Sequence, residues 1–197
     1  MADENYFRTD EAEDVAASVR HALRCWAMTK DDPHAWKWFA LALHSALQGA
    51  CVGHLLTTAT PVGPLTARSN TAWIDYFEAS RNDDTLRPPA KTELMALPDL
   101  LKAVRKAGTA GNGVAAAIPI DDGDFNWLRR FHDVIRNQFV HFEPMGWSLE
   151  VSGMAGLAKL VSRIVGDVLE AGWAFRAKKP AWNEALKADL AALAALA

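Results

Sequence analysis

The chain has 197 residues, of which 50% are hydrophobic and 23% are charged, and its formal net charge is −3 at pH 7. These values are ordinary for a globular protein and allow a sizeable core. The negative balance argues against a general nucleic-acid coat protein, but it is compatible with a local basic patch. The acidic amino-terminal stretch does not resemble a secretory signal, and no apolar run has membrane-spanning length. We therefore expect a cytoplasmic protein with no membrane partner.

The first third of the chain predicts two long helices. Asp10 is the expected cap of a helix that runs to about Met28, and Asp32 and Pro33 are expected to begin a second helix that ends near residue 56. The second helix is apolar nearly all round, which is typical of a helix in the middle of a bundle. Its exceptions form one narrow stripe: Lys37, His44, Gln48 and Cys51. Polar groups on a buried helix need partners, because an unpaired buried polar group costs about 1–3 kcal/mol.

The remainder of the chain continues the helical pattern. Residues 57–70 predict a loop, and short helices are expected at 71–80 and 98–106. A central amphipathic helix follows from about residue 125, and a long helix is expected from Ser152 to about Phe175. An Ala- and Leu-rich helical tail is expected from about residue 181. We therefore predict an all-α fold, a single domain over residues 1–197 in which four or more long helices form a bundle with short extra helices.

The two cysteines, Cys25 and Cys51, lie in apolar helical stretches. We expect reduced core residues, with a disulfide as the alternative. The aspartates at 121, 122 and 124 suit the amino-terminus of the central helix better than a cation site, because they lack the ligand order of a calcium loop. The chain also lacks an HExxH motif, cysteine partners at zinc spacing and a phosphate-binding glycine loop. The sequence predicts neither a metal nor a cofactor.

The central helix separates into two faces on a helical wheel. Its apolar face consists of Leu128, Phe131, Ile135, Phe139 and Phe142. Its polar face consists of Arg129, Arg130, His132, Asp133, Arg136, Asn137 and His141, with Val140 in the middle. Pro144 and Gly146 are expected to end the helix. Arg136, Asn137 and His141 therefore lie in the last turns and form the candidate site, although basic residues at a solvated helix end would give the same pattern.

The hexapeptide Arg136-Asn137-Gln138-Phe139-Val140-His141 resembles the signature of the HEPN superfamily, which is an arginine, a polar residue, three variable residues and a histidine. Members of that superfamily are helical bundles, and many are metal-independent RNases of toxin, antiphage and stress-defence systems. The resemblance implies a metal-independent endoribonuclease whose site is shared across a homodimer. It also implies a polar residue from an early helix beside the motif, for which His44 or Gln48 is the candidate.

The chemistry of this reaction suits the residues of the motif. If the 2′-hydroxyl of RNA attacks the adjacent phosphate, an imidazole can transfer protons at neutral pH, and an arginine can hold phosphate oxygens. We therefore expect Arg136 to bind phosphate and His141 to shuttle a proton. We expect the side-chain amide of Asn137 to orient the imidazole or a substrate oxygen. The supporting or substrate-binding candidates are His44, Gln48, Arg129, His132 and Asp133.

Two other interpretations remain open. The superfamily includes non-catalytic members, so the chain could be a helical module that binds a partner protein or a nucleotide. In that case the basic face would pair with another chain, and Val140 would be an interface contact. A cognate antitoxin or an antitoxin-like role beside a nucleotidyltransferase also fits the resemblance, although the chain contains no transferase motif of its own.

Overall fold

The structure is a computed structural model that describes residues 6–115, 117–141 and 146–197. The secondary-structure elements of these residues are helices, and the only strand-like pairing among them is an isolated antiparallel bridge between Leu65 and Leu94. The prediction of an all-α fold is therefore confirmed. None of the described helices combines the length and apolar character required to cross a bilayer.

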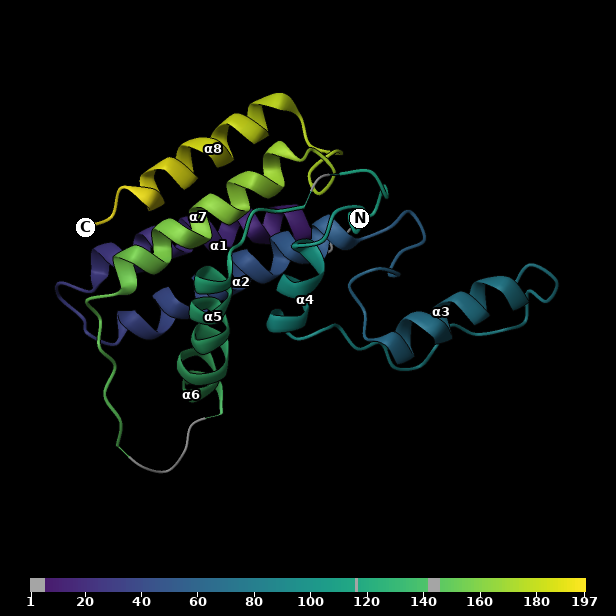
Figure 1. The fold of residues 1–197 in the computed structure, drawn as a ribbon, viewed down its shortest axis with the longest axis horizontal. Helices are drawn as coiled ribbons and strands as arrows, with labels where there is room; N and C mark the ends of the chain where they lie inside the picture. Colours follow the sequence, from purple (N-terminus) through teal and green to yellow (C-terminus); the bar gives the residue numbers. More distant parts are fainter. Residues whose placement is uncertain (1–5, 116, 142–145) are drawn as a thin grey trace, which may run out of the picture.

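Helices α1 (Glu11–Met28) and α2 (Ala35–Leu55) pack side by side (Figure 1). The Asp10 carboxylate accepts a hydrogen bond from the Glu13 amide at 2.8 Å and caps α1 as predicted. Helix α2 begins later than predicted, because residues 29–34 form turns and the Asp32 carboxylate accepts a hydrogen bond from the His34 amide. Both cysteines are buried and reduced, as expected.

Helices α7 (Met154–Glu170) and α8 (Pro180–Ala194) complete the body of the molecule. Helix α7 packs on α2, and α8 packs on both α1 and α7. Leu186, Leu190 and Leu193 of α8 are buried, and the Ser162 hydroxyl of α7 donates a 2.5 Å hydrogen bond to the Leu190 carbonyl. The carboxy-terminal tail is thus a docked helix, and it begins at Pro180 because proline suits the first helical turn.

The apolar residues that recur at helical spacing are mostly buried. Phe39, Phe131, Ile135 and Ile164 are buried, whereas Trp36 and Phe139 are half-buried at the edge of the core. Trp38 of α2 is an exception among the apolar residues of this helix, because its side chain is 51% exposed. Helix α2 contacts α1, α4, α7 and the segment that contains the predicted central helix. Helix α2 is therefore the helix around which the others are arranged.

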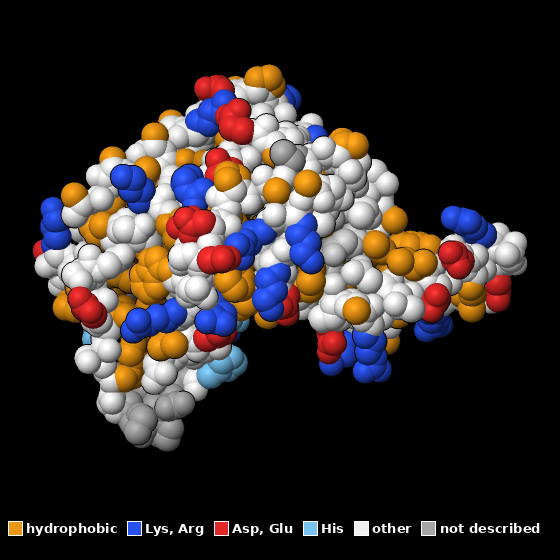
Figure 2. Space-filling view, viewed as in Figure 1, with side chains coloured by type: hydrophobic (Ala, Val, Ile, Leu, Met, Phe, Trp, Pro, Cys, Tyr) orange, Lys and Arg blue, Asp and Glu red, His pale blue; other side chains and the backbone are white. Residues whose placement is uncertain are grey.

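A separate arm extends from the body between α2 and α4 (Leu97–Val104). It carries α3 (Ala67–Ala79), which begins earlier than predicted because the Thr66 hydroxyl accepts a hydrogen bond from the Ser69 amide and caps it. Figure 1 shows α3 standing away from the other helices. In Figure 2, hydrophobic side chains gather at the surface over this arm, and Ile74, Leu86 and Leu94 are among its exposed residues.

The predicted central helix is interrupted. It consists of α5 (Asp122–Arg130), a π-helical segment η1 (Phe131–Arg136) and the short α6 (Asn137–Val140), and it crosses the direction of α2 and α7 rather than running along them (Figure 1). Asp121 caps α5 by accepting a 2.8 Å hydrogen bond from the Asp124 amide. The predictions for Phe142 and Pro144 lie outside the described residues.

Candidate functional site

Two histidines from distant parts of the chain meet where α2 contacts η1. His44 of α2 and His132 of η1 are joined by a 2.8 Å hydrogen bond between Nε2 and Nδ1. Their ring centroids are 5.1 Å apart, with an interplanar angle of 26°. His44 is only 5% exposed, whereas His132 is half-buried. His44 of the polar stripe of α2 therefore has its partner on the polar face of the interrupted helix.

The π-helical segment explains why a regular helical wheel could not place these side chains. In η1 the Asn137 amide donates to the His132 carbonyl, five residues earlier, instead of the usual four. Such a wide turn changes the angular positions of the residues after it relative to those before it. π-Helical turns inside α-helices occur frequently at functional sites. Here the wide turn runs from Phe131 to Arg136, so it ends on the first residue of the hexapeptide.

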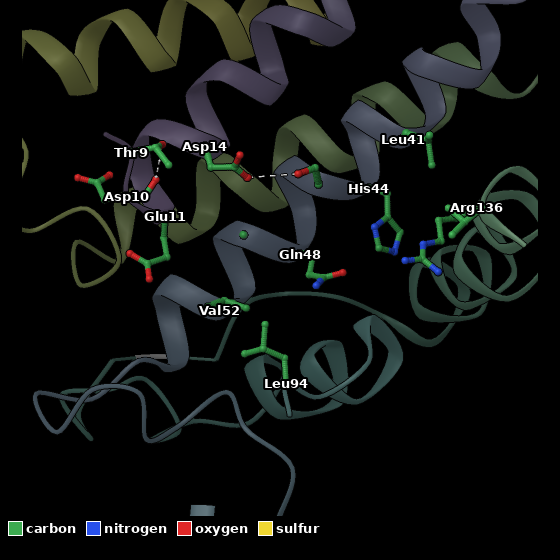
Figure 3. A pocket seen from close by; sticks show the side chains of 13 residues that line it. Thr9, Asp10, Glu11, Asp14, Leu41, His44, Gln48, Val52, Leu94 and Arg136 are labelled. Atoms are coloured by element: carbon green, nitrogen blue, oxygen red, sulfur yellow. Dashed lines mark hydrogen bonds between the residues drawn. The ribbon is translucent and has the colours of Figure 1, made fainter. Parts of the chain in front are cut away.

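Arg136 lies beside the histidine pair. In Figure 3 its side chain and that of His44 point toward one another, with Gln48 one turn further along α2. The Arg136 guanidinium donates a 2.9 Å hydrogen bond from Nη1 to Oδ1 of Asn137. The side-chain amide of Asn137 therefore orients the guanidinium, which lies at the groove.

His44, Gln48 and Arg136 line an open groove of about 600 Å³ between α2 and the end of the interrupted helix. Val140, which is 46% exposed, and Leu94 from the base of the arm add apolar contacts to the same groove. The opposite end of the groove carries three carboxylates, Asp10, Glu11 and Asp14 (Figure 3). The groove is thus cationic at Arg136 and anionic beyond Gln48.

The protonation states of the two imidazoles follow from burial and from Arg136. Burial lowers the pKa of His44 to about 3, and the neighbouring His132 and Arg136 act in the same direction. Burial and the charge of Arg136 also lower the pKa of His132, and Asp133 partly offsets this effect. Both rings therefore favour the neutral form at neutral pH, in which each has one donor and one acceptor nitrogen.

The other predicted site residues lie further from the groove. His141 is exposed at the carboxy-terminal end of α6, where its amide donates to the Asn137 carbonyl. Arg129 and Asp133 are exposed on the surface of α5 and η1. Neither they nor His141 are among the described residues that line the groove.

Several groove residues were not predicted as site residues, and Leu94 and Ser45 are among them. Leu94 lies in a stretch without regular structure and reaches the groove through the bridge that it forms with Leu65. Ser45 lines the groove and donates to the Asp14 carboxylate at 3.2 Å. Nothing in the local sequence marks Leu94, whereas Ser45, next to His44, could have been included in the polar stripe of α2.

Within the described parts of the chain, no group of three or more His, Cys, Asp or Glu side chains is arranged to hold a metal ion. The polar groups that line the groove are an imidazole, a guanidinium, an amide, hydroxyls and carboxylates. Comparison with family models, with curated proteins and with solved structures gave no significant match. The resemblance to the HEPN superfamily accordingly rests on the hexapeptide and the all-helical layout.

Proposed function

We propose that this protein is a HEPN-like, metal-independent endoribonuclease that acts as a homodimer, in which the helices form the bundle typical of that superfamily. The observation that carries the proposal is that His44 and Arg136 line an open groove and that His44 is hydrogen-bonded to His132. A guanidinium that can bind two phosphate oxygens next to neutral imidazoles suits phosphodiester cleavage without a metal.

The reaction begins at the 2′-hydroxyl of the RNA. Its oxygen attacks the adjacent phosphorus, its proton passes to an imidazole, and the bond between phosphorus and the 5′-oxygen breaks. The leaving 5′-oxygen takes up a proton, so the products are a 2′,3′-cyclic phosphate and a 5′-hydroxyl. Arg136 neutralises the charge that develops on the phosphate oxygens, and removal of such a donor typically costs about 100- to 1000-fold in rate.

His132 is the proton acceptor in this proposal. It is the less buried imidazole of the pair, and its Nδ1 is hydrogen-bonded to Nε2 of His44. In the tautomer whose Nδ1–H donates to His44, the Nε2 of His132 is free to accept the proton. The second proton transfer requires a group on the other side of the phosphate. His141 is exposed at the end of α6, and we assign it to this role from a second copy of the chain. Val140, exposed between Arg136 and His141, would be covered in that dimer.

The test is cleavage of mixed single-stranded RNA by the purified wild type and by Arg136→Lys, His132→Gln and His141→Ala. Each variant should lose at least about 100-fold in rate, because a lysine cannot reproduce the guanidinium fork and the other two changes remove a proton-transfer group. Arg130→Lys, exposed on α5, is the matched control and should cleave like the wild type. Equal degradation by the wild type and His141→Ala would reveal a contaminant and contradict the proposal.

A second candidate function is a non-catalytic module that binds a partner protein, such as a cognate antitoxin. The arm favours it, because Trp73, Tyr76 and Phe77 of α3 form an aromatic cluster away from the body, and Ile74 beside them is 45% exposed. Aromatic residues are enriched at protein interfaces. The absence of RNA cleavage by the wild type across substrates would favour this function.

A further inference from the structure

A second hollow lies beside the groove, on the other side of α6. It encloses about 500 Å³, and its walls include Trp36, Phe139 and Trp147. All three aromatic side chains are half-buried, so each has part of its ring packed and part of its ring open. Cavities of this volume with aromatic walls are typical of sites that bind small planar groups.

The three rings are held in place by their neighbours. Phe139 and Trp147 pack edge to face, with centroids 4.8 Å apart. Trp36 packs in the same manner against Trp26, at 5.2 Å, and is also in contact with Phe39 of the core. Rings fixed in this way lose little conformational entropy when they bind a flat ligand.

The charge of this hollow also differs from that of the groove. Among its described lining residues, Lys37 is the cation, His34 adds an imidazole, and no carboxylate is present. The groove, in contrast, ends in three carboxylates at the side remote from Arg136. An anionic chain that lies on Arg136 is therefore favoured to continue toward Lys37 rather than toward Asp14.

The groove and the aromatic hollow are both lined by residues of α2 and α6. Lys37 and His44 lie on one face of α2, seven residues apart, which corresponds to about 10 Å along the helix. On the opposite wall, Phe139 faces the hollow while Val140, the next residue of α6, lines the groove. A single nucleic-acid strand can therefore extend from the groove to the hollow without a change in the fold.

We propose that this aromatic hollow binds a nucleobase of single-stranded RNA whose neighbouring phosphate lies on Arg136. The inference rests on the proposed function for the identity of the strand, and it adds the substrate class: an unpaired base must be splayed out into the hollow. Single-stranded RNA is typically recognised in this way, by stacking of unpaired bases on aromatic side chains. Double-stranded RNA, whose bases are paired and stacked, cannot fill the hollow.

The test measures binding, not cleavage. A fluorescently labelled 2′-O-methyl oligonucleotide lacks the attacking hydroxyl and stays intact, so its affinity can be measured by anisotropy. Trp147→Ala should weaken binding roughly 5- to 150-fold, the range that one stacked base contributes. Trp147→Phe should retain most of the affinity, because it keeps a flat ring. Trp182→Ala, which alters a half-buried tryptophan on α8, is the matched control and should bind like the wild type.

A set of oligonucleotides, each with one abasic residue, identifies the base itself. In the wild type, one abasic position should weaken binding by about the same factor as Trp147→Ala, and the two changes together should cost little more than either alone. Equal affinity of the wild type and Trp147→Ala for every oligonucleotide would overturn the inference. A change in oligomeric state of Trp147→Ala without a change in RNA affinity would also overturn it, because the hollow would then hold a protein side chain.

The two proposals fail in different ways. If Trp147→Ala and the abasic residue weaken binding together while the wild type does not cleave RNA, the nucleobase site stands and the endoribonuclease does not. If Arg136→Lys abolishes cleavage while Trp147→Ala binds and cleaves normally, the endoribonuclease stands and the nucleobase site does not.

Discussion

The imidazoles of His44 and His132, 88 residues apart in the chain, are joined by a 2.8 Å hydrogen bond. This hydrogen bond links α2 to the π-helical segment η1, which ends at the first residue of the hexapeptide. Arg136 lies close enough to lower the pKa of both rings, in addition to the effect of burial. The three side chains therefore form one electrostatic unit, and changes to one should be measurable at the others.

Arg136→Gln should raise the pKa of His132. Burial remains in the variant, but the positive charge that opposes protonation is removed. The pKa is measured by NMR titration of the imidazole signals, with Arg130→Gln, exposed on α5, as the control that leaves it unchanged. An unchanged or lowered pKa in Arg136→Gln would show that the guanidinium does not act on the pair.

Acidification should destabilise the protein through His44. The pKa of His44 is lowered from 6.5 to about 3 in the fold, so below about pH 6.5 the unfolded chain binds a proton that the native protein does not. The free energy of unfolding is therefore not reduced by His44 above about pH 6.5, and it falls progressively as the pH is lowered from about 6.5 toward about 3. Urea unfolding of the wild type and His44→Gln at pH 7.5 and 5 measures it.

The wild type should lose more free energy of unfolding between these two pH values than His44→Gln does. The buried His54 and the half-buried His132 also have lowered pKa values, so some loss is expected in both proteins. Equal losses in the two proteins would mean that His44 can be protonated in the native state near its ordinary pKa.

Gly111→Ala should destabilise the fold by about 1–3 kcal/mol. A Cβ atom at this position would overlap the Leu56 carbonyl and the Trp173 indole nitrogen, which are joined by a 2.8 Å hydrogen bond. Gly156→Ala is the matched control, since its Cβ would meet no heavy atom within 4 Å and the position lies inside α7. It should stabilise the protein by about 0.5–1 kcal/mol. Thermal unfolding of both variants distinguishes the two effects, and similar shifts would contradict the packing at Gly111.

RNA cleavage should persist in EDTA and leave 2′,3′-cyclic phosphate ends. The proposed reaction uses only the imidazoles and the guanidinium of the protein, so chelation removes nothing that it needs. The ends are identified by their resistance to a phosphatase before, but not after, mild acid hydrolysis. Loss of activity in EDTA that added Mg²⁺ restores would contradict the mechanism.

Mixing two inactive variants should restore cleavage. If Arg136 of one copy works with His141 of another, a mixed dimer of Arg136→Lys and His141→Ala contains one intact site and one doubly altered site. Activity should appear after the two proteins are unfolded together and refolded, and it should be absent when each is refolded alone. Continued inactivity of the mixture would place both residues of one site in the same copy or outside the site.

The sequence by itself determined the helical elements and most of the buried residues. Asp10 and Asp121 cap their helices because a carboxylate satisfies the free amides of a first turn. Phe39, Phe131, Ile135 and Ile164 are buried because apolar residues at helical spacing must face the core. The caps depend on residues three positions apart in the chain, and the burial follows from the spacing of apolar residues along each helix. Both patterns can be read from a single sequence.

Only the tertiary structure decided where the chemically active side chains meet. His44 of α2 required a polar partner, and the structure shows that this partner is His132. The position of His132 depends on the wide turn at Phe131–Arg136, and no local sequence pattern predicted that turn. The distance of His141 from the groove and the approach of Leu94 to it have the same origin. These placements result from how helices distant in the sequence pack together, and helical periodicity carries no information about that packing.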